Sequence, residues 1–261
     1  MERTLKKTDI WSVFAYLILY SIIGFLIETI FGILTKGVIE SRKSFLYGPF
    51  CAIYGIGAVS MILFLKNEKK ISQIFIKGAI IGAIVEYLMS FICEKMFGVK
   101  WWDYSDYFLN INGRTCLFFA VSWGILAIFL IKNVNPVIDN FLGIIRQKNN
   151  IFRITMLLLV MLFTFDAIFT GYALKIFYYR IASEQNLDIK NKNVAEEKYS
   201  QIKQNENFSS RVNNYFSNEK ILKNYPNMII SGENKNDFCI EDLLQGTKSY
   251  YYSIGEAFSS R

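Results

Sequence analysis

The sequence contains no histidine among its 261 residues. This absence excludes imidazole metal sites, histidine proton relays and every catalytic triad that depends on histidine. The four cysteines, at positions 51, 93, 116 and 239, form no C-x-x-C pair, so a zinc site with clustered ligands is not expected. A phosphate-binding loop is also missing, so any use of ATP would need a separate ATPase subunit. We therefore expect no metal and no cofactor.

Acidic residues are fewer than basic ones, and the formal net charge is +7. A basic chain can bind nucleic acid, but Lys and Arg lie mainly between apolar segments and along the C-terminal part. Charges in these places are the usual orientation signal of membrane proteins. The expected partner is therefore the lipid bilayer and not nucleic acid.

Long apolar runs fill the first two thirds of the chain. A helix that crosses a hydrocarbon core of about 30 Å needs about 20 apolar residues. Five segments reach or approach this length, namely residues 10–34, 46–65, 71–97, 115–131 and 151–179. The first is too long for the core of a signal peptide, and we expect it to be retained. The sequence predicts an all-α, polytopic transmembrane bundle of about five spans in residues 1–180.

Lysine and arginine near the span ends predict the orientation. Ten of them lie on the side of the N-terminus and eight lie on the other side. The positive-inside rule then places the N-terminus in the cytoplasm and the tail outside, in a multi-pass plasma-membrane protein. Residues 134–145 are too short to span and are expected to form an interfacial helix after Pro136. A re-entrant segment there would instead reverse the topology.

The C-terminal tail, residues 181–261, is polar and expected to be partly helical or disordered. The spacing of Leu187, Val194, Tyr199 and Ile202 predicts that a helix continues out of the fifth span. Residues 205–220 (NENFSSRVNNYFSNEK) are typical of a solvated linker. Three apolar pieces follow that are candidates to pack on the membrane domain or to bind a partner: NMII at 227–230, FCIEDLL at 238–244 and SYYYSIGEAF at 249–258.

An internal repeat relates the first two spans to the third and fourth. The segment Gly24-Phe-Leu-Ile-Glu28 matches Gly82-Ala-Ile-Val-Glu86 at an offset of 58. The spans that follow align without gaps at an offset of 65, with identities at Gly48/Gly113, Cys51/Cys116, Phe64/Phe129 and Leu65/Leu130. Because two spans separate equivalent positions, the copies run in the same direction. We predict a parallel duplicated hairpin, related by an axis along the membrane normal.

Each copy of the repeat carries a glutamate inside an apolar span. Residues four apart share a helix face, so one stripe holds Gly24, Glu28 and Gly32, and the other holds Gly78, Gly82, Glu86 and Ser90. Small residues permit close helix packing, so each glutamate is expected to face another helix and not lipid. The two acids lie toward the outer leaflet and are candidates to approach each other across the axis.

A charge in the middle of a bilayer costs about 2.5–3.5 kcal/mol or more, so an acid in a span needs an explanation. One interpretation is a proton, cation or substrate pathway made by Glu28 and Glu86, which Asp166 of the fifth span and Arg114 could join. The alternative is a protonated acid that bridges helices, or one that pairs with Arg114 or Lys43. Burial and a second carboxylate both raise a carboxyl pKa and so favour the protonated form.

The loop KWWDYSDYFLNINGRTC, residues 100–116, mixes aromatic and polar side chains. Aromatic anchoring at the membrane surface is one interpretation of this composition. The interleaved Asp, Asn and Arg supply more polar groups than an anchor needs, which indicates a gate for a polar ligand. Its candidate residues are Trp101, Trp102, Asp103, Tyr104 and Asn110. A disulfide between Cys51 and Cys116 would be compatible with an oxidising side of the membrane.

Several of these motifs together resemble a family of bacterial membrane proteins known as putative ABC-transporter type IV permeases (CmpB-like). The motifs are Gly24 to Glu28, FLYGPFCAIYGIG at 45–57, Glu86, and WWDYS followed by Asn110, Gly113, Arg114 and Cys116-Leu117. The resemblance covers residues 10 to 180. The sequence departs from it at Lys43-Ser44, where the family usually has Arg-Gly, and at Ala52, where it usually has Pro. The resemblance implies a permease subunit.

These observations lead to two hypotheses for the function. The first is a permease or transporter subunit that moves a small solute or ion past Glu28 and Glu86, with the WWDYS loop as its gate. A separate ATPase and a second copy of the chain are the protein partners to consider. The alternative is a non-transporting scaffold or signalling partner that acts through its aromatic loops and tail. We do not expect an enzyme, because no nucleophile or metal constellation accompanies the acids.

Overall fold

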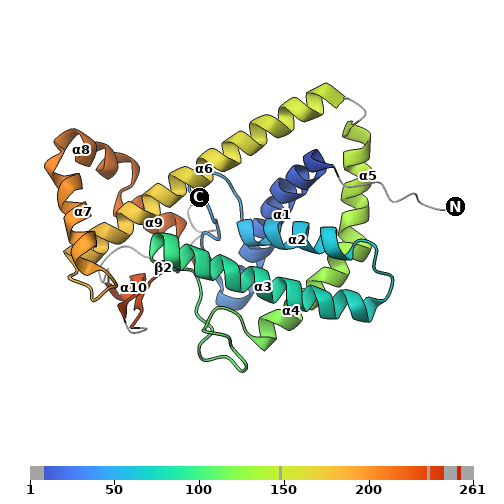
Figure 1. The fold of residues 1–261 in the computed structure, drawn as a ribbon, viewed down its shortest axis with the longest axis horizontal. Helices are drawn as coiled ribbons and strands as arrows, with labels where there is room; N and C mark the ends of the chain where they lie inside the picture. Colours follow the sequence, from blue (N-terminus) through green and yellow to red (C-terminus); the bar gives the residue numbers. More distant parts are fainter. Residues whose placement is uncertain (1–8, 147–148, 234–235, 244–251, 254–261) are drawn as a thin grey trace. The chain divides into compact units, whose positions relative to one another are not determined.

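The computed structural model describes residues 9–146, 149–233, 236–243 and 252–253, and it is almost entirely helical (Figure 1). The helices of the apolar part are α1 (Ile10–Lys36), α2 (Ala52–Leu65), α3 (Ile71–Phe97), α4 (Leu117–Phe129), α5 (Asn135–Arg146) and α6 (Asn149–Glu184). The tail contains α7 (Lys192–Gln204), α8 (Glu206–Tyr215), α9 (Asn218–Asn224) and α10 (Ile240–Leu243). Two-residue strands join loops and tail: β1 (Val38–Ile39), β2 (Val99–Lys100), β3 (Ile229–Ile230), β4 (Phe238–Cys239) and β5 (Tyr252–Ser253).

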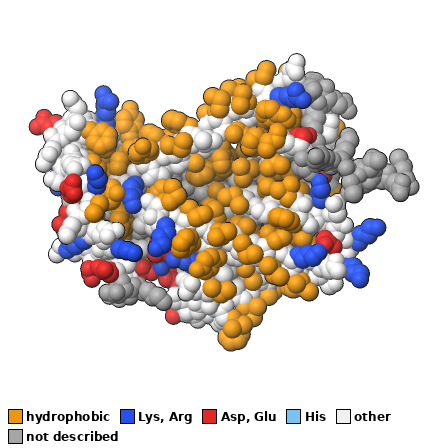
Figure 2. All heavy atoms as spheres, viewed as in Figure 1, with side chains coloured by type: hydrophobic (Ala, Val, Ile, Leu, Met, Phe, Trp, Pro, Cys, Tyr) orange, Lys and Arg blue, Asp and Glu red, His pale blue; other side chains and the backbone are white. Residues whose placement is uncertain are grey.

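Four helical runs in the described part of the chain are long and apolar enough to cross a membrane. They are Ile10–Lys36, Ile71–Phe97, Leu117–Ile145 and Asn150–Glu184. Hydrophobic side chains cover much of the face drawn in Figure 2, as expected for helices whose outer surface contacts lipid. The predicted all-α membrane bundle is confirmed. The second predicted segment, 46–65, forms a helix of 14 residues, which is about 21 Å long.

Helix α4 continues into α5 through a π-helical segment, η1 (Leu130–Val134). Pro136 has no N–H and cannot make the α-helical hydrogen bond to residue 132. In the wider π turn the N–H of Asn135 donates to the carbonyl of Leu130, and the helix passes Pro136 without a break. The predicted helix after Pro136 is therefore present, but it is continuous with α4, and its place at the membrane surface stays a prediction. Residues 134–145 end a helical run of 29 residues, Leu117–Ile145.

The chain divides into two compact units, and α1, α3 and α6 contribute residues to both. Unit 1 consists of Met1–Phe25, Pro49–Tyr87 and Tyr104–Phe165. Unit 2 consists of Leu26–Gly48, Leu88–Asp103 and Asp166–Arg261. Each unit has a hydrophobic core of its own.

In unit 1, the repeat glycines make room for aromatic rings. A Cβ at Gly24 would lie 2.2 Å from Cβ of Tyr54, and a Cβ at Gly82 would lie 2.2 Å from Cγ of Trp123. Tyr54 belongs to α2 and Trp123 to α4, so each glycine packs against the second helix of its own hairpin. The two rings also contact each other, with centroids 5.5 Å apart. The two copies of the repeat therefore meet at an aromatic pair in this core.

The ends of the hairpin helices repeat as well. Cys51 and Cys116, which align in the sequence, are the extended N-cap residues of α2 and α4. Both thiols are buried, and no disulfide joins them in the described structure. Gly37 and Gly98 follow α1 and α3 with φ of 68° and 74°, the left-handed conformation with which glycine commonly ends a helix. The strands β1 and β2 follow directly.

Unit 2 is built on the C-terminal part of α6 and on the tail. Its most buried side chains include Phe177 and Ile181 of α6 and Ile221, Tyr225 and Ile230 of the tail. The tail therefore folds on a hydrophobic core, although its overall composition is polar.

Two predictions for the tail are wrong. Helix α6 ends at Glu184 and does not continue, because the chain turns at Asn186 and Asn191, which have φ of 52° and 61°. Residues 205–220 are not a linker but form α8 and the start of α9. Val212 and Phe216, four residues apart, bury one narrow stripe of this otherwise polar segment.

The short apolar pieces of the tail form strands with the two hairpin loops. Strand β3, within NMII, pairs with β2 and with β4 in a three-stranded antiparallel sheet. FCIEDLL forms β4 and α10. Strand β5 pairs with β1 and is the part of SYYYSIGEAF that is described; the rest of that segment lies outside the described residues. The tail thus pairs with the segments that follow α1 and α3. The orientation of the termini across the membrane stays a prediction.

The contact between Gly82 and the Trp123 ring predicts that adding a methyl group at Gly82 lowers the stability of the protein. We expect Gly82→Ala to lower the stability of the protein by about 1–3 kcal/mol, because its Cβ overlaps the Trp123 ring. Gly143→Ala in α5 is the matched control, since its Cβ meets nothing within 4 Å and Ala favours a helix by up to about 1 kcal/mol. Thermal unfolding in detergent should show a lower midpoint for Gly82→Ala only. Equal midpoints for both variants would contradict this packing.

The environment of Tyr199 predicts the pH above which the folded tail loses stability. Its hydroxyl donates a hydrogen bond to Glu184, and burial, followed by this hydrogen bond, raises the pKa of Tyr199 from 10.0 to about 12. The folded tail favours the neutral phenol, so this stabilisation is complete below pH 10 and is lost as the pH rises through about 12. Thermal unfolding from pH 9 to 12 should show this loss in the wild type. The difference from Tyr199→Phe, which cannot ionise, should shrink over the same interval.

Candidate functional site

Glu86 lies on the protein-facing side of α3. Its stripe is buried throughout and consists of Gly78, Gly82, Glu86 and Ser90. The opposite stripe is about half exposed and consists of Ile76, Ile80, Ile84 and Leu88. Only 4% of Glu86 is exposed. The structure therefore places this acid away from lipid, as the small-residue spacing predicts.

Both carboxylate oxygens of Glu86 accept hydrogen bonds from the second loop. The Tyr104 hydroxyl donates to Oε1 at 3.2 Å, and the Thr115 hydroxyl donates to Oε2 at 2.8 Å. The donors come from the two ends of the loop, since Tyr104 belongs to WWDYS and Thr115 directly precedes the N-cap of α4. These hydrogen bonds offset part of the cost of burying a polar group. Glu86 therefore joins a candidate span to both arms of the loop.

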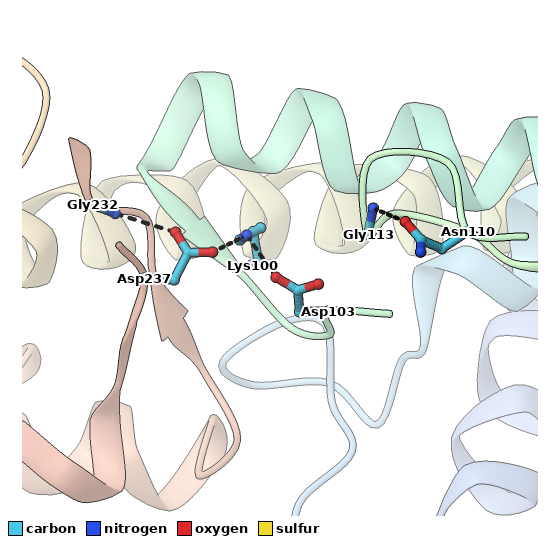
Figure 3. Close-up of polar contacts among 6 residues, drawn as sticks. All are labelled: Lys100, Asp103, Asn110, Gly113, Gly232 and Asp237. Carbon is cyan, nitrogen blue, oxygen red and sulfur yellow. Dashed lines mark hydrogen bonds and ion pairs between the residues drawn. The ribbon is translucent and has the colours of Figure 1, made fainter. Parts of the chain in front are cut away.

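Asn110 orders the loop between these arms. Its side-chain amide donates to the carbonyls of Ser105 at 2.8 Å and Tyr107 at 3.0 Å. Its side-chain oxygen accepts the N–H of Gly113 at 3.1 Å, as Figure 3 shows. The N–H of Tyr104 donates to the carbonyl of Gly113 at 2.7 Å. Gly113 has φ of 66°, which suits glycine. The loop is therefore a folded turn in which Asn110 has a structural role.

Arg114 and the ring of Tyr104 rest on neighbouring aromatic side chains. The Arg114 guanidinium lies 5.8 Å from the centroid of the Tyr87 ring, a cation–π distance. The Tyr87 hydroxyl accepts a hydrogen bond from Asn112 at 3.1 Å. Tyr104 stacks on Phe119 of α4, with centroids 4.3 Å apart and an interplanar angle of 18°. Successive residues of α3, 86 and 87, thus both bind the second loop.

The gate residues predicted from the sequence divide between the two units. Tyr104 and Asn110 belong to unit 1 and take part in the contacts just described. Trp101, Trp102 and Asp103 belong to unit 2. There Trp101 packs edge-on against Tyr225 of the tail, with centroids 6.1 Å apart, and Asp103 pairs with Lys100 at 3.2 Å. Trp102 is half-buried.

Asp166 holds the first loop within unit 2. This acid is 4% exposed and accepts the N–H groups of Tyr47 at 3.2 Å and Gly48 at 2.7 Å. The Thr170 hydroxyl donates to it at 3.3 Å and accepts the N–H of Leu46 at 3.0 Å. Asp166 therefore stabilises the turn before Pro49. A buried turn needs acceptors for its backbone N–H groups. The FLYGPF turn was therefore the sequence signal that could have predicted this role of Asp166.

Glu28 lies half-buried on α1 in unit 2. One turn later, a Cβ at Gly32 would lie 3.1 Å from the guanidinium of Arg42, so Gly32 makes room for a loop side chain. Arg42 forms an ion pair with Glu40, which is 7% exposed and also pairs with Lys36 at 3.1 Å. Glu40 was not among the residues predicted from the sequence, and its signal was the charged run at 40–43. Glu28 and Glu86 fall in different units, and their shared pathway stays a prediction.

The long apolar helices, the repeated hairpin and the buried acid define a multi-span helical membrane protein. The family model described as "Putative ABC-transporter type IV" matches residues 15–171, and the chain belongs to this family. The match includes both hairpins and ends within α6, before the tail. No curated protein and no solved structure matches the chain.

The Glu86 cluster predicts how the second loop responds to the loss of one hydroxyl. We expect Thr115→Val to leave Oε2 without this donor and to speed amide hydrogen exchange at residues 104–115 by about tenfold. Thr115→Ser keeps the hydroxyl and should exchange like the wild type. Mass spectrometry of the exchanged protein in nanodiscs measures both. Similar exchange in the valine and serine variants would show that this hydrogen bond does not order the loop.

Proposed function

We propose that the protein is the membrane-spanning subunit of a transporter, in which Glu86 and its repeat partner Glu28 lie on the path of a proton. Membership of the ABC-transporter type IV family supports a transport function. The observation that carries the residue assignment is a carboxylate inside an apolar helix, 4% exposed and hydrogen-bonded by a polar loop. Ionisable groups inside spans commonly mark ion or substrate pathways.

The hydrogen-bond donors on Glu86 suggest how such a site would work. A hydroxyl can donate a hydrogen bond to a carboxylate, and it can also rotate to accept a hydrogen bond from a protonated carboxylic acid. Tyr104 and Thr115 can therefore accompany Glu86 in either protonation state. Proton exchange at Glu86 would then be coupled to the position of the loop. Use of ATP would require a separate ATPase chain, because the sequence has no phosphate-binding loop.

Reconstitution of the full chain into liposomes with trapped pyranine tests the proposal. Valinomycin and a potassium gradient set the membrane potential, and dye fluorescence reports proton entry. We expect the wild type to acidify the lumen faster than protein-free liposomes do, and Glu86→Gln and Glu28→Gln each to slow this by at least about tenfold, because an amide cannot carry the proton. Glu68→Gln, which removes an acid paired with Lys77 outside the repeat stripes, should conduct normally.

Two results would overturn the proposal. Wild-type liposomes that acidify no faster than empty ones would favour the scaffold hypothesis, in which the loops and folded tail bind a partner. Flux that survives in both glutamine variants would assign the two acids a structural role only. Thermal unfolding of each variant separates loss of flux from loss of folding.

A further inference from the structure

The tail binds both loops of the repeated hairpin through strands. Val38 and Ile39 of the first loop pair with Ser253 and Tyr252. Val99 of the second loop pairs with Ile230, and its neighbour Lys100 pairs with Ile229. The N–H of Ser231 extends the second pairing with a hydrogen bond to the carbonyl of Gly98 at 2.9 Å. Equivalent points of the two hairpins are thus held by one C-terminal segment.

The second of these pairings is both buried and charged. Val99 and Ile230 are fully buried in the core of unit 2. At its rim, Lys100 forms ion pairs with Asp237 of the tail and with Asp103 of its own loop (Figure 3). Asp237 also accepts the N–H of Gly232 at 3.3 Å, which orients its carboxylate toward Lys100.

The protonation of Lys100 matches this arrangement. Burial alone would lower the pKa of Lys100, but the hydrogen bond and charge of Asp237, followed by those of Asp103, raise it above the usual value. The side chain is therefore charged at neutral pH and holds both acids. The tail therefore holds Val99 and Lys100 directly, and it holds Asp103 through the Lys100 side chain.

The next residue of the chain is Tyr104, the donor to Glu86. A peptide bond therefore joins the last residue of the tail-bound segment to the first residue of the Glu86 cluster. Consecutive Cα atoms are fixed about 3.8 Å apart, so the hold on Asp103 limits the positions that the backbone of Tyr104 can reach. Hydrogen bonds lose their energy steeply when distance and angle change, so Tyr104 is sensitive to a shift of Asp103.

We propose that the tail is a clamp on the second loop: its hold on residues 98–103 through β3 and Asp237 sets the position of Tyr104 and thereby the hydrogen bonding of Glu86. Loosening the clamp frees the loop at Glu86. As a control on transport the clamp rests on the function proposed above, whereas its effect on loop order does not. The family match ends at residue 171, so the clamp comes from a part of the chain outside that match.

A disulfide rescue tests the clamp, because Ile229 stands between two partners. It pairs with Lys100 of the loop on one side and with Cys239 of the tail on the other. Cross-strand neighbours have Cβ atoms about 4.5–5.5 Å apart, a spacing from which small shifts reach disulfide geometry. The loop–tail staple is a disulfide between Lys100→Cys and Ile229→Cys, in a variant that also carries Cys239→Ser. The control staple lies within the tail and is a disulfide between Ile229→Cys and the native Cys239. This variant also carries Lys100→Met, which breaks the ion pair with Asp237. Cys93→Ala in every variant removes a competing thiol.

The readout is amide hydrogen exchange at residues 104–115 in nanodiscs. We expect Lys100→Met and Asp237→Asn to raise this exchange by about tenfold, since both break the ion pair. The oxidised loop–tail staple should restore wild-type exchange and lose it again on reduction. The oxidised staple within the tail should leave exchange fast. Unchanged exchange in Lys100→Met and Asp237→Asn, or no rescue by the loop–tail staple, overturns the clamp.

Proton flux by the same variants separates the two proposals. If wild-type liposomes conduct, flux should change at least about threefold in Lys100→Met and return with the oxidised loop–tail staple. Altered exchange with unaltered flux would overturn the clamp as a control on transport. If the wild type does not conduct but the exchange pattern holds, the transport function fails and the clamp on the loop stands.

Discussion

The need to satisfy buried acids organises both loops of this protein. An acid in an apolar helix must find hydrogen-bond donors, and here the connecting loops supply them. Glu86 takes the hydroxyls of Tyr104 and Thr115, whereas Asp166 takes the backbone N–H groups of Tyr47 and Gly48. One helix carboxylate is thus matched to each loop, and each pair lies within one unit. This shared constraint explains why irregular segments keep a defined fold beside long apolar helices.

The repeated hairpin provides the frame on which these loops are mounted. Gly24 and Gly82 let α2 and α4 approach closely, and the rings of Tyr54 and Trp123 join the two hairpins. The helices after each loop begin at equivalent cysteines, and the helices before them end at left-handed glycines. A duplicated backbone therefore carries two loops of different length and chemistry. The longer second loop uses Asn110 to fold upon itself.

Sequence patterns predicted the features that depend on local spacing. Apolar length predicted the helices, and small residues four apart predicted that Glu86 faces protein. Features that depend on distant partners were missed: Asp166 binds a turn 118 residues away, and Val212 contributes to a core assembled from several short segments. The course of the chain past Pro136 was also missed, because proline usually ends a helix and the π turn that accommodates it has no clear sequence signal.

The two-residue strands β1 and β2 have a consequence for relatives with a different C-terminal part. In this chain β5 and β3 cover their backbone N–H and C=O groups. A family member whose chain ended with the last span would leave the edges of these two strands unpaired. Unpaired edges recruit other strands, so such a protein would need a second polypeptide, or a loop redesigned with charge or proline, to avoid self-association.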